Sequence, residues 1–276
     1  KIRLHVVPFT KIQLDIIDRD ATIGNEYIQK YYDGSITSLT KYPSILVPNI
    51  KWKSNNITTL FYSNPYIVYV PKIDFKGITT MTQTFHASSL IYFDAVNLPD
   101  VTSLINTFRN TKIKELSLNI PSCKTAQFTV GQCVYLTKIS IIAPSLNNTL
   151  QLFYDDNKLV DVHLEIGNTW TNADQTFRGC TSLKTLHLLD FSNVTSAESI
   201  FLNCSSLTNI EGFIGLKTNI SFSSSPLTPL SVHNVIEQAL GNFTLTLHAD
   251  SKANWEASEY YEQDLITMIE KNITIA

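Results

Sequence analysis

The sequence predicts an α/β repeat solenoid with one parallel strand in each coil, and three observations support this. A short pattern recurs every 23 or 24 residues, each copy has the same spacing of apolar residues, and a segment with helical spacing follows the last copy. The clearest copies, Phe177–Leu183 and Phe201–Leu207, share the form F-x-x-C-x-S-L. Self-similarity at this period is typical of solenoids, because one coil buries its apolar face only when the next coil stacks on it.

Each copy continues as L-x-x-Φ-x-Φ, where Φ is apolar, and this pattern predicts a short strand whose alternate residues point inward. The first apolar positions of the copies are Tyr42, Tyr66, Leu90, Ile113, Leu136, Leu159, Leu183 and Leu207. We therefore expect a leucine-rich-repeat solenoid of about eight coils over residues 42–228.

A large apolar residue precedes each predicted strand, and further apolar residues stand four and seven positions before it. The large residues are Phe61, Phe85, Phe108, Val130, Phe153, Phe177 and Phe201. We expect all three sets to point into the core, with Thr149 as the exception in the set four positions before.

The four cysteines follow the repeat, which predicts a structural role. Cys133, Cys180 and Cys204 stand three residues after the large apolar residue, in a column that suits small or polar side chains bonded to the turn backbone. Cys123 substitutes for an apolar residue in another column. Cys180 and Cys204 lie on adjacent coils, so a disulfide between them is an alternative. We expect no catalytic thiol.

Residues 1–41 lie outside the repeat. Alternating apolar residues on both sides of Pro8-Phe9 predict a β-hairpin, which either covers the first coil or belongs to a preceding domain. Because the chain begins at Lys1 rather than Met, we expect it to be a processed or excised piece of a longer protein.

Residues 229–276 are predicted to form an αβα cap on the last coil, where an open end would expose apolar side chains and a strand edge. Thr228 and Pro229 suit the N-cap and first turn of a helix that runs to Leu240. Residues 243–247 alternate as a strand. Ser251 is then expected to start a second helix that carries Trp255, Leu265 and Ile269.

Composition excludes several classes of function. Charged residues make up 16% of the chain, below the usual share of about 25%, and the formal net charge is −3. A nucleic-acid binder would show a basic excess. No apolar run reaches the length of a membrane span. Phosphate loops and the common hydrolase and zinc-protease motifs are missing, so we expect no enzyme activity and no cofactor.

The outward side chains of the strands form the expected binding surface of a solenoid. Early in the repeat they are apolar, and we expect one exposed patch there. It is the candidate binding site and comprises Leu46, Ile67, Val68, Val70, Ile91 and Tyr92. Either a partner or the N-terminal segment covers such a patch.

Later outward positions are charged. Glu115, Lys138 and Asp161 are expected to stack as a ladder of alternating charge. We expect no metal site in general; the one candidate set in the strands is His163, His187 and Glu211, which stand on successive rungs and could hold a divalent ion.

Two segments resemble a known family. The form F-x-x-C-x-S-L-x-x-Φ, together with residues 190–195 (DFSNVT), is similar to the BspA-like leucine-rich repeats of bacterial surface proteins. The ending, from residues 222–228 (FSSSPLT) to Ile273–Ile275, resembles the cap that closes many such proteins. The resemblance covers residues 42–276, although Asn64, Ser88 and Thr111 replace the cysteine in early coils.

Members of this family are mostly exported, and several are adhesins. The resemblance therefore implies an extracellular or cell-surface location. We expect a non-catalytic recognition and adhesion module that binds a protein or glycan ligand through its sheet face. The alternative is a structural or receptor-binding protein of a bacteriophage or virus, a virion component that carries the same repeat; symmetric oligomerisation would favour it.

Overall fold

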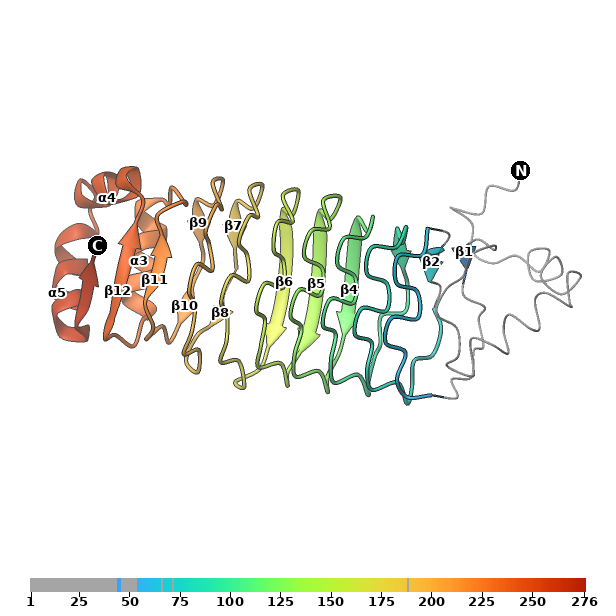
Figure 1. Ribbon diagram of the computed structural model, residues 1–276. Helices are drawn as coiled ribbons and strands as arrows, with labels where there is room; N and C mark the ends of the chain where they lie inside the picture. Colours follow the sequence, from blue (N-terminus) through green and yellow to red (C-terminus); the bar gives the residue numbers. More distant parts are fainter. Residues whose placement is uncertain (1–43, 46–53, 66, 71, 188) are drawn as a thin grey trace, which may run out of the picture.

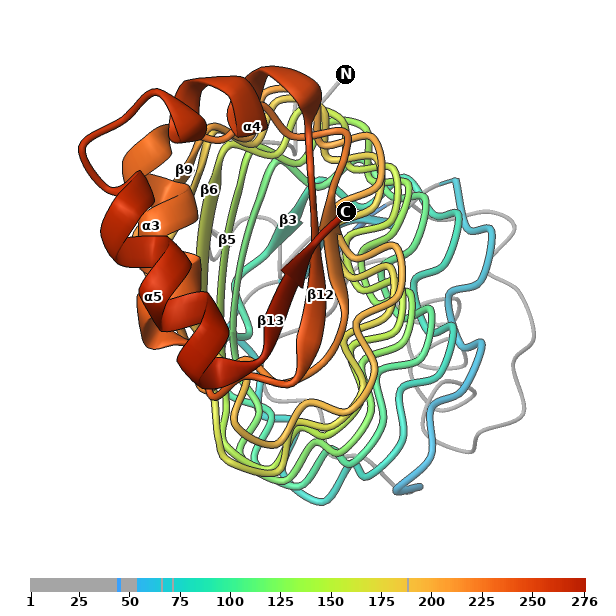
Figure 2. The same ribbon diagram turned by 90° about the vertical axis from the view of Figure 1, so that its left-hand side faces the viewer.

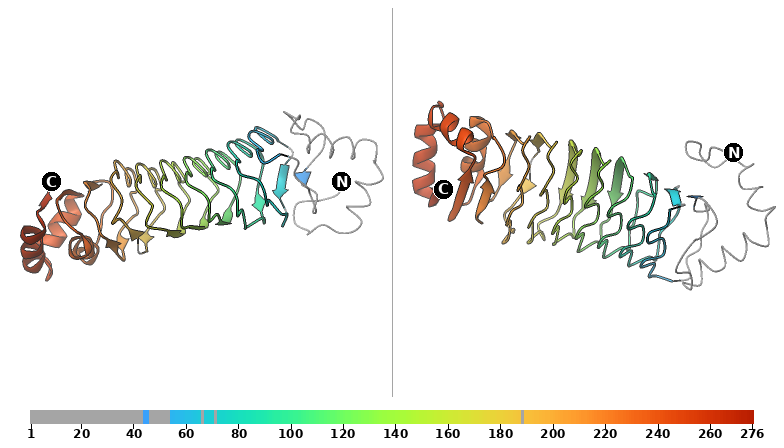
Figure 3. Two further views of the ribbon diagram at one scale, coloured as in Figure 1. Left: turned by 90° about the horizontal axis from the view of Figure 1, so that it is seen from below. Right: turned by 45° about the horizontal axis from the view of Figure 1, so that its top comes forward.

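The computed structural model describes residues 44–45, 54–65, 67–70, 72–187 and 189–276. It shows a parallel β-solenoid of about eight turns, with helices at its C-terminal end (Figure 1). The turns stack side by side along one axis in every view (Figure 3). The hairpin expected in residues 1–41 lies outside the described residues.

One side of the solenoid, called here the sheet wall, is built from short parallel strands. They pair in three sections, β1-β2-β3, β4-β5-β6 and β7-β9, rather than as the single uninterrupted sheet that we expected. The strands are β1 (Ser44–Ile45), β2 (Ile67–Val70), β3 (Tyr92–Phe93), β4 (Glu115–Asn119), β5 (Lys138–Ala143), β6 (Asp161–Ile166), β7 (Thr185–Leu186) and β9 (Asn209–Ile210). A further pair, β8 (Leu189–Asp190) and β10 (Phe213–Ile214), follows β7 and β9 along the chain.

The expected register is confirmed in the middle of the sheet wall and wrong by one residue at β2. Leu116 pairs with Ile139 as predicted, and both are buried. In contrast, Tyr69 pairs with the exposed Tyr92, and Val70 pairs with the buried Phe93. Because side chains alternate along a strand, this shift relative to β3 exchanges the inward and outward positions of Tyr69 and Val70, whereas on the other side Ile45 pairs with Tyr69 as predicted, next to an irregularity in the pairing.

The opposite side, called here the turn wall, consists of residues 57–63, 81–87, 104–110, 126–132, 149–155, 173–179 and 197–203. Each of these segments contains two residues with positive φ, four positions apart; in one coil they are Gln175 at 52° and Gly179 at 81°. Successive backbone N–H groups there alternate between a carbonyl of the next coil and a carbonyl of their own turn. Phe177 donates to Ile200 of the next coil, whereas Arg178 donates to Gln175 within its own turn. The turn wall therefore satisfies its backbone without forming strands.

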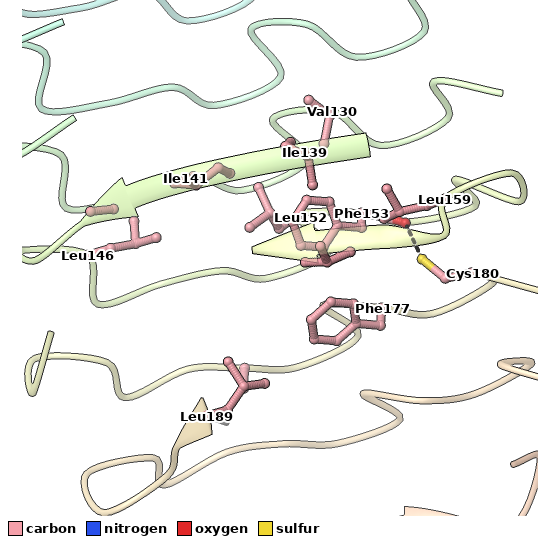
Figure 4. Close-up of a cluster of buried hydrophobic side chains, with 14 of the residues drawn as sticks. Val130, Ile139, Ile141, Leu146, Leu152, Phe153, Leu159, Phe177, Cys180 and Leu189 are labelled. Atoms are coloured by element: carbon pink, nitrogen blue, oxygen red, sulfur yellow. Dashed lines mark hydrogen bonds between the residues drawn. The ribbon is translucent and has the colours of Figure 1, made fainter. Parts of the chain in front are cut away.

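The core between the two walls contains the predicted apolar columns. Phe61, Phe85 and Phe108 stack on one another, as do Phe153, Phe177, Phe201 and Phe222, with ring centroids 5.0–5.7 Å apart. Val130 separates the two stacks and is itself fully buried. Figure 4 shows Phe153 and Phe177 among the aliphatic residues of neighbouring coils. Burial of these aromatic columns is the main favourable term that holds successive coils together.

The C-terminal segment adds helices and a second small sheet. It contains β11 (Ile220–Phe222), α3 (Pro229–Gln238), β12 (Phe243–Leu247), α4 (Ala249–Glu256), α5 (Tyr261–Lys271) and β13 (Ile273–Ile275). Viewed along the solenoid, α3 and α5 lie beside the sheet wall (Figure 2). Thr228 is the N-cap of α3, as predicted, and its hydroxyl accepts a hydrogen bond from the Ser231 N–H.

The expected second helix is two helices, and the first of them begins at Ala249, with His248 as its N-cap, rather than at Ser251. Ser258 interrupts it, because its hydroxyl donates to the Trp255 carbonyl at 2.7 Å and accepts from the Tyr260 N–H. Trp255 is buried and Leu265 is partly buried, whereas Ile269 is 81% exposed. Of the three apolar residues named for the expected helix, Ile269 therefore faces solvent.

Candidate functional site

The middle of the sheet wall carries the predicted ladder of charges. Glu115 pairs in register with Lys138, and Lys138 pairs with Asp161. The Lys138 ammonium lies 2.7 Å from a carboxylate oxygen of Asp161, and both side chains are about half exposed. This hydrogen bond and charge attraction raise the pKa of Lys138. The ladder is confirmed. Because its side chains are exposed to solvent, which screens their charges, each ion pair contributes little to stability.

Two residues of the predicted apolar patch are buried, and the register shift between β2 and β3 accounts for one of them, Val70. Ile67 and Val70 are buried, at 2% and 0% exposure, so the expectation that they form a surface is wrong. Tyr92 is 42% exposed, and Ile91 is partly buried. Leu46 lies outside the described residues, as does the side chain of Val68.

Tyr69 takes the place of the buried residues on this surface. Its hydroxyl donates to a carboxylate oxygen of Asp94 at 2.8 Å, one coil further along. Partial burial and this hydrogen bond raise the pKa of Tyr69 to about 12, so the phenol remains a donor over the physiological range. The early part of the sheet wall thus presents two neighbouring tyrosines and a carboxylate, in place of an aliphatic patch.

The proposed metal set on the strands separates into two pairs. His163 Nε2 lies 2.8 Å from Glu165 on its own strand, and His187 Nδ1 lies 2.7 Å from Glu211 on the next coil. Within the described residues, His163, His187 and Glu211 do not come together as a group of three ligands. Because His163 bonds along its strand and not to the next rung, the expectation of a site from stacked rungs is wrong.

A different group has atoms close enough to hold a metal ion. His233 and Glu237, four residues apart on α3, approach Asp264 of α5, and their ligand atoms lie within 4.8 Å of one another. These atoms already have protein partners. Asp264, which is fully buried, bonds both His233 Nδ1 and Trp255 Nε1 at 2.7 Å, and Glu237 accepts from Thr267 at 2.6 Å. We interpret the group as a hydrogen-bonded network that joins α3 to α4 and α5.

The sequence analysis missed this network, although one signal was present. Positions four apart face the same side of a helix, so His233 and Glu237 are neighbours in any helix that covers residues 229–238. Asp264 could not be paired with them in advance, because the relative placement of two helices depends on tertiary packing.

The cysteines are structural, as predicted, and all four are free thiols. Cys180 donates to the Phe153 carbonyl of the preceding coil at 3.2 Å (Figure 4), and Cys204 donates to the equivalent Phe177 carbonyl at 3.0 Å. The alternative of a disulfide between them is therefore wrong in this structure. Burial raises the pKa of Cys123 and of Cys204 to about 12, which disfavours the nucleophilic thiolate.

A column of buried threonines has the same role and was also missed. Thr84, Thr107, Thr129 and Thr176 stand directly before the large apolar residue, and each hydroxyl donates to a carbonyl of the preceding coil. Thr149, the exception in its own column, pairs with the Thr176 hydroxyl at 2.7 Å and accepts from Trp170 Nε1. The recurring Thr-Phe pair was the signal for this column.

Asp156 stands three residues after Phe153, in the column that holds cysteine in other coils, and it is fully buried. One of its carboxylate oxygens accepts from the Cys133 N–H at 2.7 Å, and the other has no hydrogen-bond partner in the described part of the chain. Burial raises the pKa of Asp156 well above its ordinary value, which favours the neutral acid. This residue is a stability liability and lies too deep to contact a ligand.

Comparison with protein-family models, with curated proteins and with solved structures gave no match to this chain. No helix in the described ranges combines the length and apolar character needed to cross a bilayer.

Proposed function

We propose that this protein is a non-catalytic recognition module that binds a protein or glycan through its sheet wall. The observation that carries the proposal is the fixed register of outward side chains on neighbouring coils, Glu115 to Lys138 to Asp161. Parallel rungs about 4.8 Å apart hold such side chains in a rigid array before any ligand arrives. A preorganised array loses little conformational entropy on binding.

The chemistry of the array suits a macromolecular partner. Tyr92 is exposed beside Tyr69, and tyrosine is enriched where proteins bind one another. The charged middle section supplies both signs, which favours specificity over general electrostatic attraction. His163 and His187 add groups that both donate and accept hydrogen bonds at the far end.

The proposal extends to family and location. Buried cysteines bonded to the preceding coil are consistent with BspA-like leucine-rich repeats, and the C-terminal helices are consistent with a cap. Buried thiols with raised pKa values support a non-catalytic role. Adhesion at the cell surface is the corresponding activity.

Substitutions on the two walls test the proposal. The double variant Tyr92→Asp, Lys138→Glu changes the sheet wall, and Tyr62→Asp is its matched control because Tyr62 is 45% exposed on the turn wall. Binding would be measured on a glycan array and to intact cells. We expect wild type and the control to bind alike and the double variant to lose binding at least tenfold. Equal binding by all three proteins would reject the sheet wall as the site.

A further inference from the structure

The turn wall is held together by a regular ladder of hydrogen bonds between coils. In the coil that begins at Ala173, the N–H groups of residues 173, 175, 177 and 179 donate to carbonyls of residues 196, 198, 200 and 202 at 2.8–3.1 Å. The coils that begin at Ile57, Met81, Leu104, Ala126 and Thr149 repeat this pattern. In each case the donors point towards the coil that follows.

The ladder stops at the last coil of the turn wall. The N–H groups of Ala197, Ser199, Phe201 and Asn203 make no hydrogen bond within the described part of the chain. The reason is a change of backbone conformation. The next segment, β11, is extended and pairs with β12, so it does not present carbonyls in the pattern of a further turn coil.

A cavity lies between this unpaired edge and the C-terminal strands. Its volume is about 460 Å³, and it is half open to solvent rather than enclosed. Its polar lining residues are Glu198, Asn219, Ser199, Ser221, Ser223, Thr244 and Thr246. Ala197, Leu202 and Ile220 supply apolar contacts.

The lining defines what the occupant must offer. Backbone N–H groups require acceptors, the Glu198 carboxylate requires donors, and the hydroxyls accept either. None of the lining residues is a lysine or arginine, and Glu198 would repel an anion. The occupant is therefore not an anion, and it carries donors and acceptors close together.

We propose that this cavity binds a saccharide, with sugar hydroxyls accepting from the unpaired N–H groups of Ala197 and Ser199, the two that belong to lining residues, and donating to Glu198. The C–H faces of a sugar ring suit the apolar part of the lining. An extended peptide fits less well. Ser199 and Asn203 are left-handed, with φ of 52° and 64°, so their edge lacks the straight two-residue repeat that strand addition uses. The site is on the turn wall and is independent of the function proposed for the sheet wall.

The free protein gives a first test, by amide hydrogen exchange in the full chain. We expect the N–H groups of Ser199 and Phe201 to exchange much faster than those of Gln175 and Phe177, which have acceptors on the next coil. Equal protection of the two sets would show that the donors are already paired and would overturn the proposal.

Saccharide titration gives the second test. The probes are maltotriose, cellotriose, galactose and the trimer of N-acetylglucosamine, followed by amide chemical shifts, with a set of extended peptides in parallel. At least one saccharide should shift and protect residues 197–203, and no peptide should do so. Shifts with peptides alone, or with no probe, would overturn the proposal.

Variants assign the binding to the cavity. Glu198→Gln should weaken saccharide binding about tenfold or more, because a hydrogen bond to a charged acceptor is lost. Thr246→Val removes a lining hydroxyl at nearly constant shape and should weaken binding severalfold. Thr185→Val, on β7 of the sheet wall, is the matched control and should bind as wild type does. Loss of binding in the control alone would place the saccharide on the sheet wall and reject the cavity.

Discussion

The two walls of the solenoid carry the same 23–24-residue repeat but satisfy their backbones differently. On the sheet wall, short strands pair in register and alternate side chains face solvent, as with Lys138 and Asp161. On the turn wall, every second N–H group reaches the next coil, and buried side chains such as Thr107 and Cys180 satisfy carbonyls of the coil before. Buried side chains therefore satisfy backbone groups beneath the turn wall, whereas alternate side chains of the sheet wall face solvent.

This difference explains the low charge of the chain. Buried columns require small side chains that can donate a hydrogen bond without the cost of burying a charge. Threonine, serine, cysteine and asparagine meet this requirement, and they occupy the columns that contain Thr84, Ser88, Cys133 and Asn64. Substitutions in the turn wall and its core should therefore cost more stability than comparable ones on the sheet wall.

The largest effect is expected for Phe177→Ala, in the core beneath the turn wall. Phe177 is fully buried and stacks between Phe153 and Phe201, at centroid distances of 5.3 and 5.7 Å. We expect a loss of about 3–5 kcal/mol in the free energy of unfolding, measured with urea. Tyr92→Ala on the sheet wall is the comparison and should change it by less than about 0.5 kcal/mol. Similar losses in both variants would contradict the comparison.

Thr107→Val tests the buried hydroxyl column. The Thr107 hydroxyl donates to the Met81 carbonyl at 2.8 Å, and valine keeps the shape but removes this hydrogen bond, while the N–H and hydroxyl of Thr84 still donate to the same carbonyl. The expected loss is about 0.5–1.5 kcal/mol in the same measurement. Thr185→Val, its counterpart on the sheet wall, should be nearly neutral, and a larger loss at Thr185 would reverse the argument.

Asp156→Asn should raise stability at neutral pH. The pKa of Asp156 is raised, so the stability of the wild type is fully present below the ordinary value of 3.8 and is lost as the pH rises towards the folded-state pKa. Asparagine keeps an acceptor for the Cys133 N–H, and Asn64 already occupies this column in another coil. We expect a gain of about 1–3 kcal/mol at pH 7 that shrinks towards pH 4.

Urea unfolding at several pH values checks this prediction. An Asp156→Asn variant whose advantage does not change between pH 4 and pH 7 would show that ionisation of the carboxyl group is not the cause. Asp161→Asn, on the exposed ladder, is a suitable control because it replaces a carboxylate that is about half exposed.

The smallest effect is expected for Lys138→Ala on the sheet wall. The ion pair with Asp161 is short, at 2.7 Å, but both side chains are about half exposed. We expect a loss smaller than that of Thr107→Val, and it decreases further in high salt. A loss as large as that of Thr107→Val would show that the sheet wall also depends on its side chains for stability.

Sequence periodicity was sufficient for the solenoid, for the inward columns and for the start of α3 at Thr228. It failed at β2. There Tyr66, Tyr69 and Pro71 fitted the repeat, but the structure pairs Val70 rather than Tyr69 with Phe93. The failure matters because part of the candidate binding patch depended on it, and Val70 is buried instead of exposed.

The sequence by itself determined the repeat, the number of coils and the residue types of each buried column, because every coil must present the same apolar and hydroxyl groups to its neighbours. Only the tertiary structure decided the register of β2, the network of His233, Glu237 and Asp264, and the unpaired edge at Ala197–Asn203. These features depend on which residues of distant segments come into contact. A one-residue shift in register, or a change from turn to strand, leaves the spacing of apolar residues in the sequence almost unchanged. Their effect on the surface is large, because they reverse which groups face solvent and which donors lack partners.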